Sequence, residues 1–324
     1  MDSPTTVTAR ETIPARATKP PHHYGDQVAY LVTLISSAAI ILITALLFYK
    51  LYVDAAPTRD KFGWHFLSGT TWDPVALEFG ALPFVYGTLV TSALALIIGV
   101  PLGIGASIFL AELAPLGLSD ALAFIIELLA AVPSVIYGLL AIFTLVPFVR
   151  DDMAPALMAI LGFLPIFQGP AYGVSLLAGG CILAIMILPF IISISREVLL
   201  AVPREQREAS LALGATRWET AWHVVMPYAK TGIIGSIFLA LARALGETMA
   251  VTMVIGNDPR IRASLFAPGY SIAAVIANEF SEATSGMHTS ALIELGFVLF
   301  FITILVNALA RVLILAMDRK NSTA

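Results

Sequence analysis

Long apolar runs alternate with short polar segments along the chain. Six runs reach or exceed the roughly 20 residues that a helix needs to cross a bilayer. They cover residues 28–51, 81–111, 119–148, 173–195, 231–256 and 290–317. A transmembrane β-barrel would instead show short segments of alternating hydrophobicity. The pattern therefore predicts an all-α polytopic membrane protein with six transmembrane helices.

Prolines and glycines inside two of these runs predict departures from straight, evenly spaced helices. Pro101 and Pro133 lie in the second and third runs. Each should kink its helix or break a backbone hydrogen bond, because proline has no N–H and its ring crowds the preceding turn. Gly99 and Gly103 are four residues apart, a spacing that lets a neighbouring helix approach closely.

Composition supports the membrane class and excludes others. Of 324 residues, 58% are hydrophobic and 12% are charged, against about 25% charged in a soluble domain. The mean hydropathy is +0.89. The net charge of −4 argues against nucleic acid as a partner. The single cysteine, Cys181, excludes an intrachain disulfide and is predicted to be a small packing residue.

The polar segments divide the chain into four parts. Residues 1–27 are rich in Thr, Pro and charge and are predicted to be a disordered cytoplasmic tail. The first run is longer than the apolar region of a secretory signal, so residues 28–80 should hold a retained first helix and an outer loop. Residues 81–317 would form a core of five helices, and residues 318–324 a short cytoplasmic tail.

The distribution of Lys and Arg predicts the orientation, because cytoplasmic loops carry an excess of both. With the N-terminus in the cytoplasm, eleven of the 18 fall in inside segments and six in outside segments, while Arg243 lies within an apolar run. Both termini are therefore predicted to be cytoplasmic, in a multi-pass protein of the plasma (inner) membrane. The outer loop 257–289 contains a weakly helical stretch at 271–282.

Arg243 and Glu247 stand near the middle of the fifth run. A charge at bilayer depth costs at least about 2.5–3.5 kcal/mol, so it usually faces a polar pathway or a buried partner. A spacing of four would place both residues on one helical face, and the fork of donors on arginine suits an oxyanion. The pair predicts a polar, anion-related pathway. The alternative is an internal salt bridge that fixes helix packing.

Weaker candidates for the pathway are Thr248 and Ser134, which could offer hydroxyls to an anion, and Glu127 in the third run. Packing is the commoner role of such hydroxyls, and Glu127 could equally pair with another helix. The five histidines show no metal-ligand spacing, and none of the five lysines follows a glycine as in a phosphate-binding loop. We therefore expect no metal, no cofactor and no enzymatic activity, with any ATP site on another polypeptide.

The segment 203–228 is the long polar stretch between two inside ends. Pro203 suits the first position of a helix, and Gly214 suits its end. Thr216 and Glu219 have the spacing of a capping box for a second short helix, which Pro227 should end. Exposed apolar residues on this hairpin indicate a docking surface for another protein. The alternative is an amphipathic hairpin on the membrane surface with no partner.

The same segment resembles the Glu-Ala-Ala loop of permease subunits of ATP-binding-cassette (ABC) importers. The matching residues are Glu208-Ala209-Ser210, Gly214 and Val224-Val225-Met226-Pro227. The spacing agrees with that family, with Ser for the second Ala, Val for Ile and Met for Leu. The resemblance implies a type I (MetI-like) importer permease. It also implies that Glu208, Ala209, Gly214 and Pro227 belong to a coupling loop that docks on an ATPase subunit.

Further motifs resemble phosphate permeases, and the PstC type more than its sister type PstA. They are Trp72-Asp73-Pro74, the run 82–89, the run 131–138, the run 243–251, Ile255-Gly256-Asn257, Ser264-Leu265-Phe266 and Ile276-Ala277-Asn278-Glu279-Phe280. The similarity runs from about residue 25 to 317. It implies a heterodimer with a PstA-type permease, two PstB-type ATPase subunits and an extracytoplasmic phosphate-binding protein.

The resemblance also implies that an arginine and a glutamate on the fifth helix serve phosphate translocation by alternating access. Arg243 can bond two phosphate oxygens at once. Two explanations fit Glu247: it pairs with Arg243 when the pathway is empty, or it accepts a hydrogen bond from a protonated phosphate oxygen, which sulfate lacks. Alternative functions are a permease for molybdate or sulfate, and an ion-coupled secondary transporter.

Overall fold

The computed structural model describes residues 24–321, so residues 1–23 of the predicted N-terminal tail and 322–324 of the predicted C-terminal tail lie outside the described residues. The chain divides into two units, Met1–Tyr49 and Lys50–Ala324. The first unit contains most of α1 (Tyr24–Asp54), which begins four residues before the predicted start of the first span. Its 30-residue apolar stretch Gly25–Asp54 is long enough to cross a membrane.

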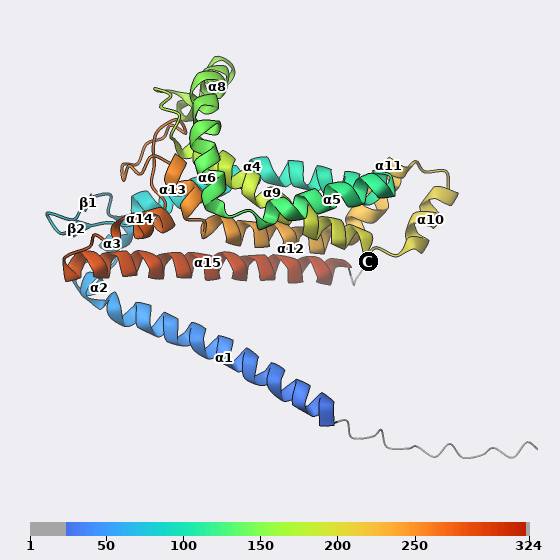
Figure 1. Ribbon diagram of the computed structural model, residues 1–324, viewed down its shortest axis with the longest axis horizontal. Helices are drawn as coiled ribbons and strands as arrows, with labels where there is room; N and C mark the ends of the chain where they lie inside the picture. Colours follow the sequence, from blue (N-terminus) through green and yellow to red (C-terminus); the bar gives the residue numbers. More distant parts are fainter. Residues whose placement is uncertain (1–23, 322–324) are drawn as a thin grey trace, which may run out of the picture. The chain divides into compact units, whose positions relative to one another are not determined.

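The second unit is built around long helices that lie lengthwise beside one another (Figure 1). They are α4 (Leu82–Ile108), α5 (Leu116–Ala131), α9 (Leu176–Leu200), α12 (Met226–Leu245) and α15 (Gly286–Asn321). Three π-helical segments, η1 (Phe109–Leu113), η2 (Val149–Met153) and η4 (Ala221–Val225), and the 3-10 turn η3 (Pro165–Phe167) adjoin the helices.

Short elements lie at both ends of the long helices. One end, here the hairpin end, holds α2 (Ala56–Phe62), α3 (His65–Ser68), the antiparallel pair β1 (Trp72–Asp73) and β2 (Glu78–Phe79), and α14 (Ile272–Glu279). The other, here the α10 end, holds α10 (Arg204–Ala212) and α11 (Arg217–Thr220). The helix expected within 271–282 is therefore present as α14, with the Ser271 hydroxyl accepting the Ala274 N–H.

The most buried helix is α9, and glycines on α4 set its distance from α9. A Cβ added at Gly103 would lie 2.6 Å from the Ile191 side chain, and one at Gly99 would lie 3.1 Å from Ile187. These contacts confirm the close approach predicted from the glycine spacing. Cys181 on α9 is a buried free cysteine, as predicted.

Aromatic side chains form the core of the hairpin end. The Trp72 ring lies 4.8 Å from both Phe79 and Phe84, edge on in each case. The Trp72 Nε1–H donates to Glu279 Oε2 over 2.9 Å, and His288 Nε2 lies 3.0 Å from the same oxygen. This cluster fixes α14 and the start of α15 against the start of α4.

Two of the predicted spans are not single helices. Among residues 24–321, five helices are long and apolar enough to span a membrane, and a sixth span exists only if a bent pair counts as one. In that pair α5 ends at Ala131, and α6 (Ser134–Phe143) leaves it at 93°. The interruption predicted at Pro133 is confirmed, because proline lacks an N–H and disfavours the helical conformation at Val132, whose ψ is 129°. The third run, 119–148, is therefore not one continuous helix.

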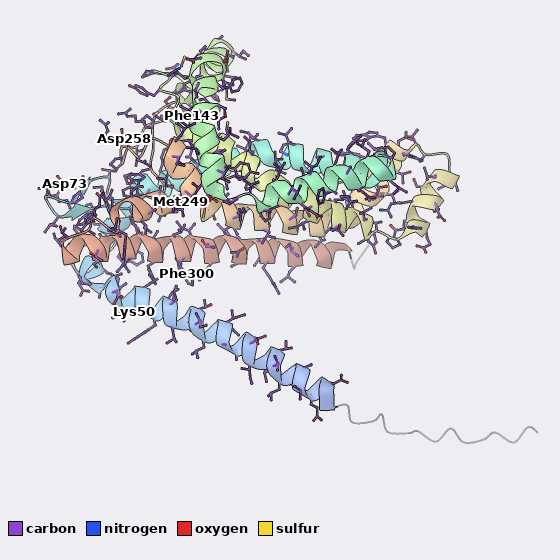
Figure 2. The ribbon with its side chains drawn as sticks, in the orientation of Figure 1. Lys50, Asp73, Phe143, Met249, Asp258 and Phe300 are labelled. Atoms are coloured by element: carbon purple, nitrogen blue, oxygen red, sulfur yellow. The ribbon has the colours of Figure 1, made fainter. Side chains whose placement is uncertain are left out.

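After this bend the chain continues through α7 (Leu145–Phe148), η2 and α8 (Ala154–Leu161). In Figure 1, α6 and α8 run across the direction of α5. The fifth predicted span, 231–256, is also interrupted: α12 ends at Leu245, and α13 (Met249–Val254) follows after three residues. Figure 2 labels Met249 at the start of α13 and Phe143 at the end of α6.

Candidate functional site

The interruption between α12 and α13 separates the two charged residues that the sequence singled out. Arg243 lies in the last turn of α12, whereas Glu247 lies within the break at 246–248. The expectation that both share one helical face is therefore wrong, because the helix ends at Leu245 beside Gly246, a residue that favours helix ends. Arg243 and Glu247 form no ion pair among the interactions of the described residues.

Arg243 is exposed on this chain and has an aromatic neighbour. Its guanidinium carbon lies 4.3 Å from the centre of the Phe190 ring on α9. The phenol of Tyr137, on α6, lies within electrostatic range of the same guanidinium. A cation over an aromatic face is worth about 0.5–2 kcal/mol, depending on its exposure to water. The guanidinium is thus held in place on one side while its remaining donors stay available.

Glu247 has a local role that the sequence did not suggest. Its Oε1 accepts a hydrogen bond from the Ala250 N–H over 3.4 Å, at the first turn of α13. A carboxylate there accepts from a backbone N–H that has no partner within the helix, and its negative charge interacts favourably with the positive end of the helix dipole. The Thr248 hydroxyl donates to Gly246 O over 3.3 Å, so it also bonds within the break.

The helix α6, which follows the bend after α5, packs against α13, which follows the break after α12. The Tyr137 hydroxyl donates to Leu129 O over 2.8 Å across the bend, and Ser134 is the first residue of α6. Gly138 brings α6 against α13, since a Cβ there would lie 2.5 Å from Met253 Sδ and 3.0 Å from Ala250 Cα. Two interrupted helices in contact within a membrane region are a common arrangement at substrate sites.

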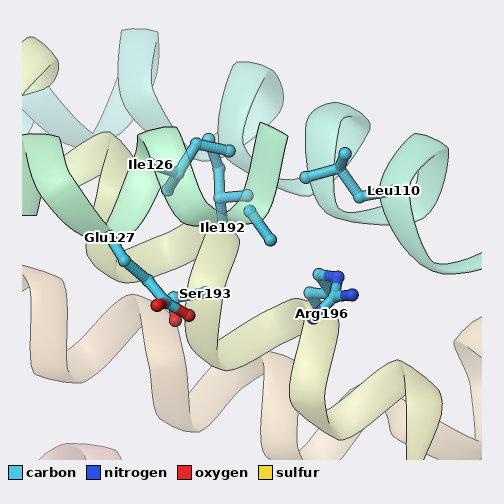
Figure 3. A pocket seen from close by; sticks show the side chains of 7 residues that line it. Leu110, Ile126, Glu127, Ile192, Ser193 and Arg196 are labelled. Atoms are coloured by element: carbon cyan, nitrogen blue, oxygen red, sulfur yellow. The ribbon is translucent and has the colours of Figure 1, made fainter. Parts of the chain in front are cut away.

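Glu127 lies beside Ser193 of α9, three residues beyond Phe190, which contacts Arg243. It lines a small pocket between α5 and α9 together with Ser193 and Arg196 (Figure 3). Arg196 donates to Ser119 Oγ over 3.3 Å and to Asp120 Oδ1 over 3.4 Å. The pocket has room for little more than a water molecule, so phosphate does not fit in it, and its charged lining residues are Glu127 and Arg196.

The segment 203–228 forms two short helices joined by a glycine turn. Pro203 caps α10 rather than occupying its first position, and Gly214 has a φ of +90°. The predicted capping box is confirmed: the Thr216 hydroxyl accepts the Glu219 N–H over 3.2 Å, and Glu219 Oε2 accepts the Thr216 N–H over 2.8 Å. We call residues 203–228 the coupling segment from here on.

Much of the coupling segment is open to solvent. Glu208 and Ala209 are exposed on α10, and nothing lies within 4 Å of a Cβ added at Gly214. The Leu213 side chain at the turn is 91% exposed. Trp218 and Trp222 are also exposed and stack with ring centres 5.9 Å apart. Such an apolar surface in a polar segment is typical of a docking site for another protein.

Pro227 does not end the second helix, contrary to the sequence-based expectation. The helix continues from Arg217 to Leu245 through α11, η4 and α12, and Pro227 lies at the start of α12. The π-helical segment just before it widens the backbone, which accommodates the missing N–H and the bulk of the ring. The coupling segment is therefore continuous with the helix that carries Arg243.

Phe190 and Tyr137 were missed by reasoning from the sequence. Phe190 lies in an apolar run in which any residue could face lipid or pack in the core, so the local sequence does not indicate a contact with Arg243. Tyr137 belongs to the run 131–138 that carries the resemblance, and that run could have identified it. Among residues 24–321, no three His, Cys, Asp or Glu side chains gather closely enough to hold a metal ion.

The loop after α13 carries charge outside the spans. Asp258 Oδ2 accepts from Arg260 Nη2 over 2.6 Å and lies 3.6 Å from Arg262 Nη2. The hydrogen bonds from Arg260 lower the pKa of Asp258, so its carboxylate stays ionised below the usual range. The Tyr86 hydroxyl on α4 donates to Arg262 O over 3.0 Å, which holds this loop against α4.

Comparison with known proteins places these features in a family. Residues 99–323 match the family described as binding-protein-dependent transport system inner membrane component. The chain is 44% identical over 299 residues to the phosphate transport system permease protein PstC of Mesorhizobium japonicum, covering 91% of each chain. It is 48% identical over 262 residues to the PstC of Xylella fastidiosa, covering 80% of this chain and 81% of the relative.

Solved structures of low sequence identity share the fold. The MetNI methionine ABC transporter, in an inward-facing conformation, matches with a TM-score of 0.53 at 18% identity over 72% of this chain and 96% of that chain. A bacterial ABC transporter involved in the import of alginate matches with a TM-score of 0.56 at 16% identity over 88% of this chain and 96% of that chain. These likenesses concern the arrangement of the helices alone.

Proposed function

The chain belongs to the family of binding-protein-dependent transport system inner membrane components, and from this we propose that it is the permease subunit of an ABC importer for inorganic phosphate. The observation that carries the proposal is the Arg243 guanidinium, which lies inside a candidate span, rests on Phe190 and keeps donors available. Phosphate is the substrate in the names of the relatives, which include the Mesorhizobium japonicum protein, 44% identical, and the Methanocaldococcus jannaschii protein, 35% identical over 283 residues.

Phosphate at neutral pH is a mixture of mono- and dianion. Its passage through the membrane needs a cation that compensates for the hydration water it loses. Arg243 supplies a positive charge and a planar fork of donors that can bond two phosphate oxygens. Ser134 and Thr248 lie at the two helix interruptions and could add hydroxyl donors. Glu247 could accept a hydrogen bond from a protonated phosphate oxygen, which would disfavour sulfate. In this proposal Glu127 has no direct part.

The exposure of Arg243 supports a pathway shared with a second permease. A guanidinium at bilayer depth is too costly to face lipid, so another polar surface should cover it. We infer a heterodimer with a PstA-type permease, two PstB-type ATPase subunits on the coupling segments, and a phosphate-binding protein on the opposite side. The coupling segment would then be cytoplasmic, both termini would be inside, and the chain itself would not hydrolyse ATP.

ATP-driven movement of the ATPase subunits would reach the pathway through the continuous helix from Arg217 to Leu245. Rigid-body movement of this helix would expose the Arg243 site to one side and then to the other. The two alternatives, a permease for molybdate or sulfate and an ion-coupled secondary transporter, gain no support from the relatives or from the family.

The test is ATP-dependent uptake of radiolabelled phosphate by proteoliposomes that contain this chain, its sister permease, the ATPase and the binding protein. Arg243→Gln should abolish uptake in an assembled complex that still hydrolyses ATP, whereas the control Arg311→Gln should not. Unchanged uptake by Arg243→Gln would remove Arg243 from the pathway. A wild-type complex that carries another oxyanion but no phosphate would overturn the substrate.

A further inference from the structure

The Arg207 side chain is largely covered, although α10 as a whole has only exposed and half-buried residues. Arg207 reaches Glu112 in η1, the π-helical continuation of α4, with an Nη2–Oε1 distance of 2.8 Å. The Arg207 Nε lies 3.1 Å from Oε1 and 3.2 Å from Oε2 of the same carboxylate. The side chains of Arg207 and Glu112 are only 17% and 10% exposed. This is a two-pronged, largely desolvated ion pair, the geometry in which arginine binds a carboxylate most strongly.

The same guanidinium also bonds to the end of α9. Its Nη2 donates to Leu199 O over 2.6 Å, and its Nη1 donates to Val202 O. These carbonyls belong to the last turn of α9 and the residues just beyond it, where helices leave acceptors without partners. A cation there also interacts favourably with the negative end of the helix dipole. One side chain therefore joins α10, α4 and α9.

Few other contacts fix α10 to the rest of the chain. None of its nine residues is fully buried, so apolar packing holds the helix weakly. The Ser210 hydroxyl lies 3.0 Å from the Thr220 hydroxyl, a contact that joins α10 to α11 within the coupling segment. The bonds of Arg207 are thus the polar connection between α10 and the ends of α4 and α9.

We propose that the Arg207–Glu112 pair is the mechanical link that transmits movement of α10 to α4 and α9. The helix α9 carries Phe190, on which Arg243 rests, so a displacement of α10 would change the environment of the pathway cation. The inference rests on the proposed function, which places an ATPase subunit against the coupling segment. Arg207 and Glu112 are positioning residues: they act through α9 and α4 and touch no substrate.

Weakening the Arg207–Glu112 pair should uncouple phosphate transport from ATP hydrolysis. Arg207→Lys keeps the charge but loses the fork, and Glu112→Gln keeps the shape but loses the charge. In proteoliposomes with the assembled complex, each variant should retain ATPase activity within about twofold of wild type. Phosphate uptake should fall at least tenfold, so that the ATP hydrolysed per phosphate rises at least tenfold. The matched control is Arg311→Lys, an exposed arginine on α15, outside the coupling segment.

A parallel fall of uptake and ATP hydrolysis, or an unchanged ratio of ATP hydrolysed to phosphate taken up, would overturn the proposal. Either result would mean that the pair only supports folding or does not matter.

A second measurement does not depend on the substrate. Spin labels at Ala212 on α10 and Leu102 on α4, in a Cys181→Ala background, should keep one distance with and without ATP in wild type. In Arg207→Lys that distance should change with ATP, and a change already in wild type would refute a rigid link.

The two experiments also separate this inference from the proposed function. If the wild-type complex takes up no phosphate, the proposed function fails, while the spin-label distances still decide whether α10 and α4 move as one body.

Discussion

The guanidinium carbon of Arg243 lies 4.3 Å from the centre of the Phe190 ring. The two residues are 53 positions apart and come from α12 and α9, so neither helix alone positions the cation. The ring holds one face of the guanidinium and leaves the N–H edge available for an anion. The position of the cation thus depends on the packing of α9 against α12.

Replacing Phe190 with Leu should reduce phosphate uptake by about two- to thirtyfold, because a cation–π contact of roughly 0.5–2 kcal/mol is lost. Arg243 would keep its charge but would be less well oriented. Phe190→Tyr keeps an aromatic face and should retain most of the uptake. Initial rates in proteoliposomes measure both, and equal rates for the Leu and Tyr variants would show that the ring does not orient Arg243.

Replacing Glu247 with Gln separates a structural role from a role in selectivity. The Gln side-chain oxygen can still accept a hydrogen bond from the Ala250 N–H, so the free energy of unfolding should change by less than about 1 kcal/mol. If the carboxylate selects protonated phosphate, the variant should also admit sulfate. Competition of sulfate with labelled phosphate measures this, with the exposed Glu282→Gln as control. A Glu247→Gln transporter that still excludes sulfate would contradict the selectivity role.

Replacing Gly138 with Ala should push α6 away from α13. The added Cβ would lie 2.5 Å from Met253 Sδ and 3.0 Å from the Ala250 backbone, and overpacking of this kind costs about 1–3 kcal/mol. We expect a lower unfolding temperature in detergent and slower uptake. Gly105→Ala on α4 is the matched control, because nothing lies within 4 Å of its added Cβ. Equal stability of the two variants would show that α6 and α13 can separate freely.

Replacing Leu213 with Asp should weaken binding of the ATPase subunit while the permease itself stays folded. The side chain is 91% exposed, and surface substitutions usually change stability by no more than about 0.5 kcal/mol. A charge in the centre of an apolar docking surface should cost at least about tenfold in affinity. Co-purification with the ATPase measures this, and Leu213→Met should bind normally. Normal binding by the Asp variant would place the docking surface elsewhere.

Local patterns determined several features of this chain. Apolar runs of bilayer length located the long helices, because a helix in lipid must satisfy its own backbone and present apolar side chains over about 20 residues. The capping box at Thr216 and Glu219 and the close contacts of Gly99 and Gly103 were also predictable, since each depends on residues three or four positions apart.

Contacts between distant residues determined the rest. The break after Leu245 turned an expected Arg243–Glu247 pair into a cation on Phe190 and a cap on α13. The continuation of the helix through Pro227 depended on a π-helical turn that no local pattern showed. The Arg207–Glu112 pair joins positions 95 residues apart. A charged side chain in a membrane protein interacts with whichever partner packing brings near it. The sequence could therefore indicate that Arg243 needs a polar pathway or a buried partner, while only the tertiary structure could identify Phe190 as its neighbour.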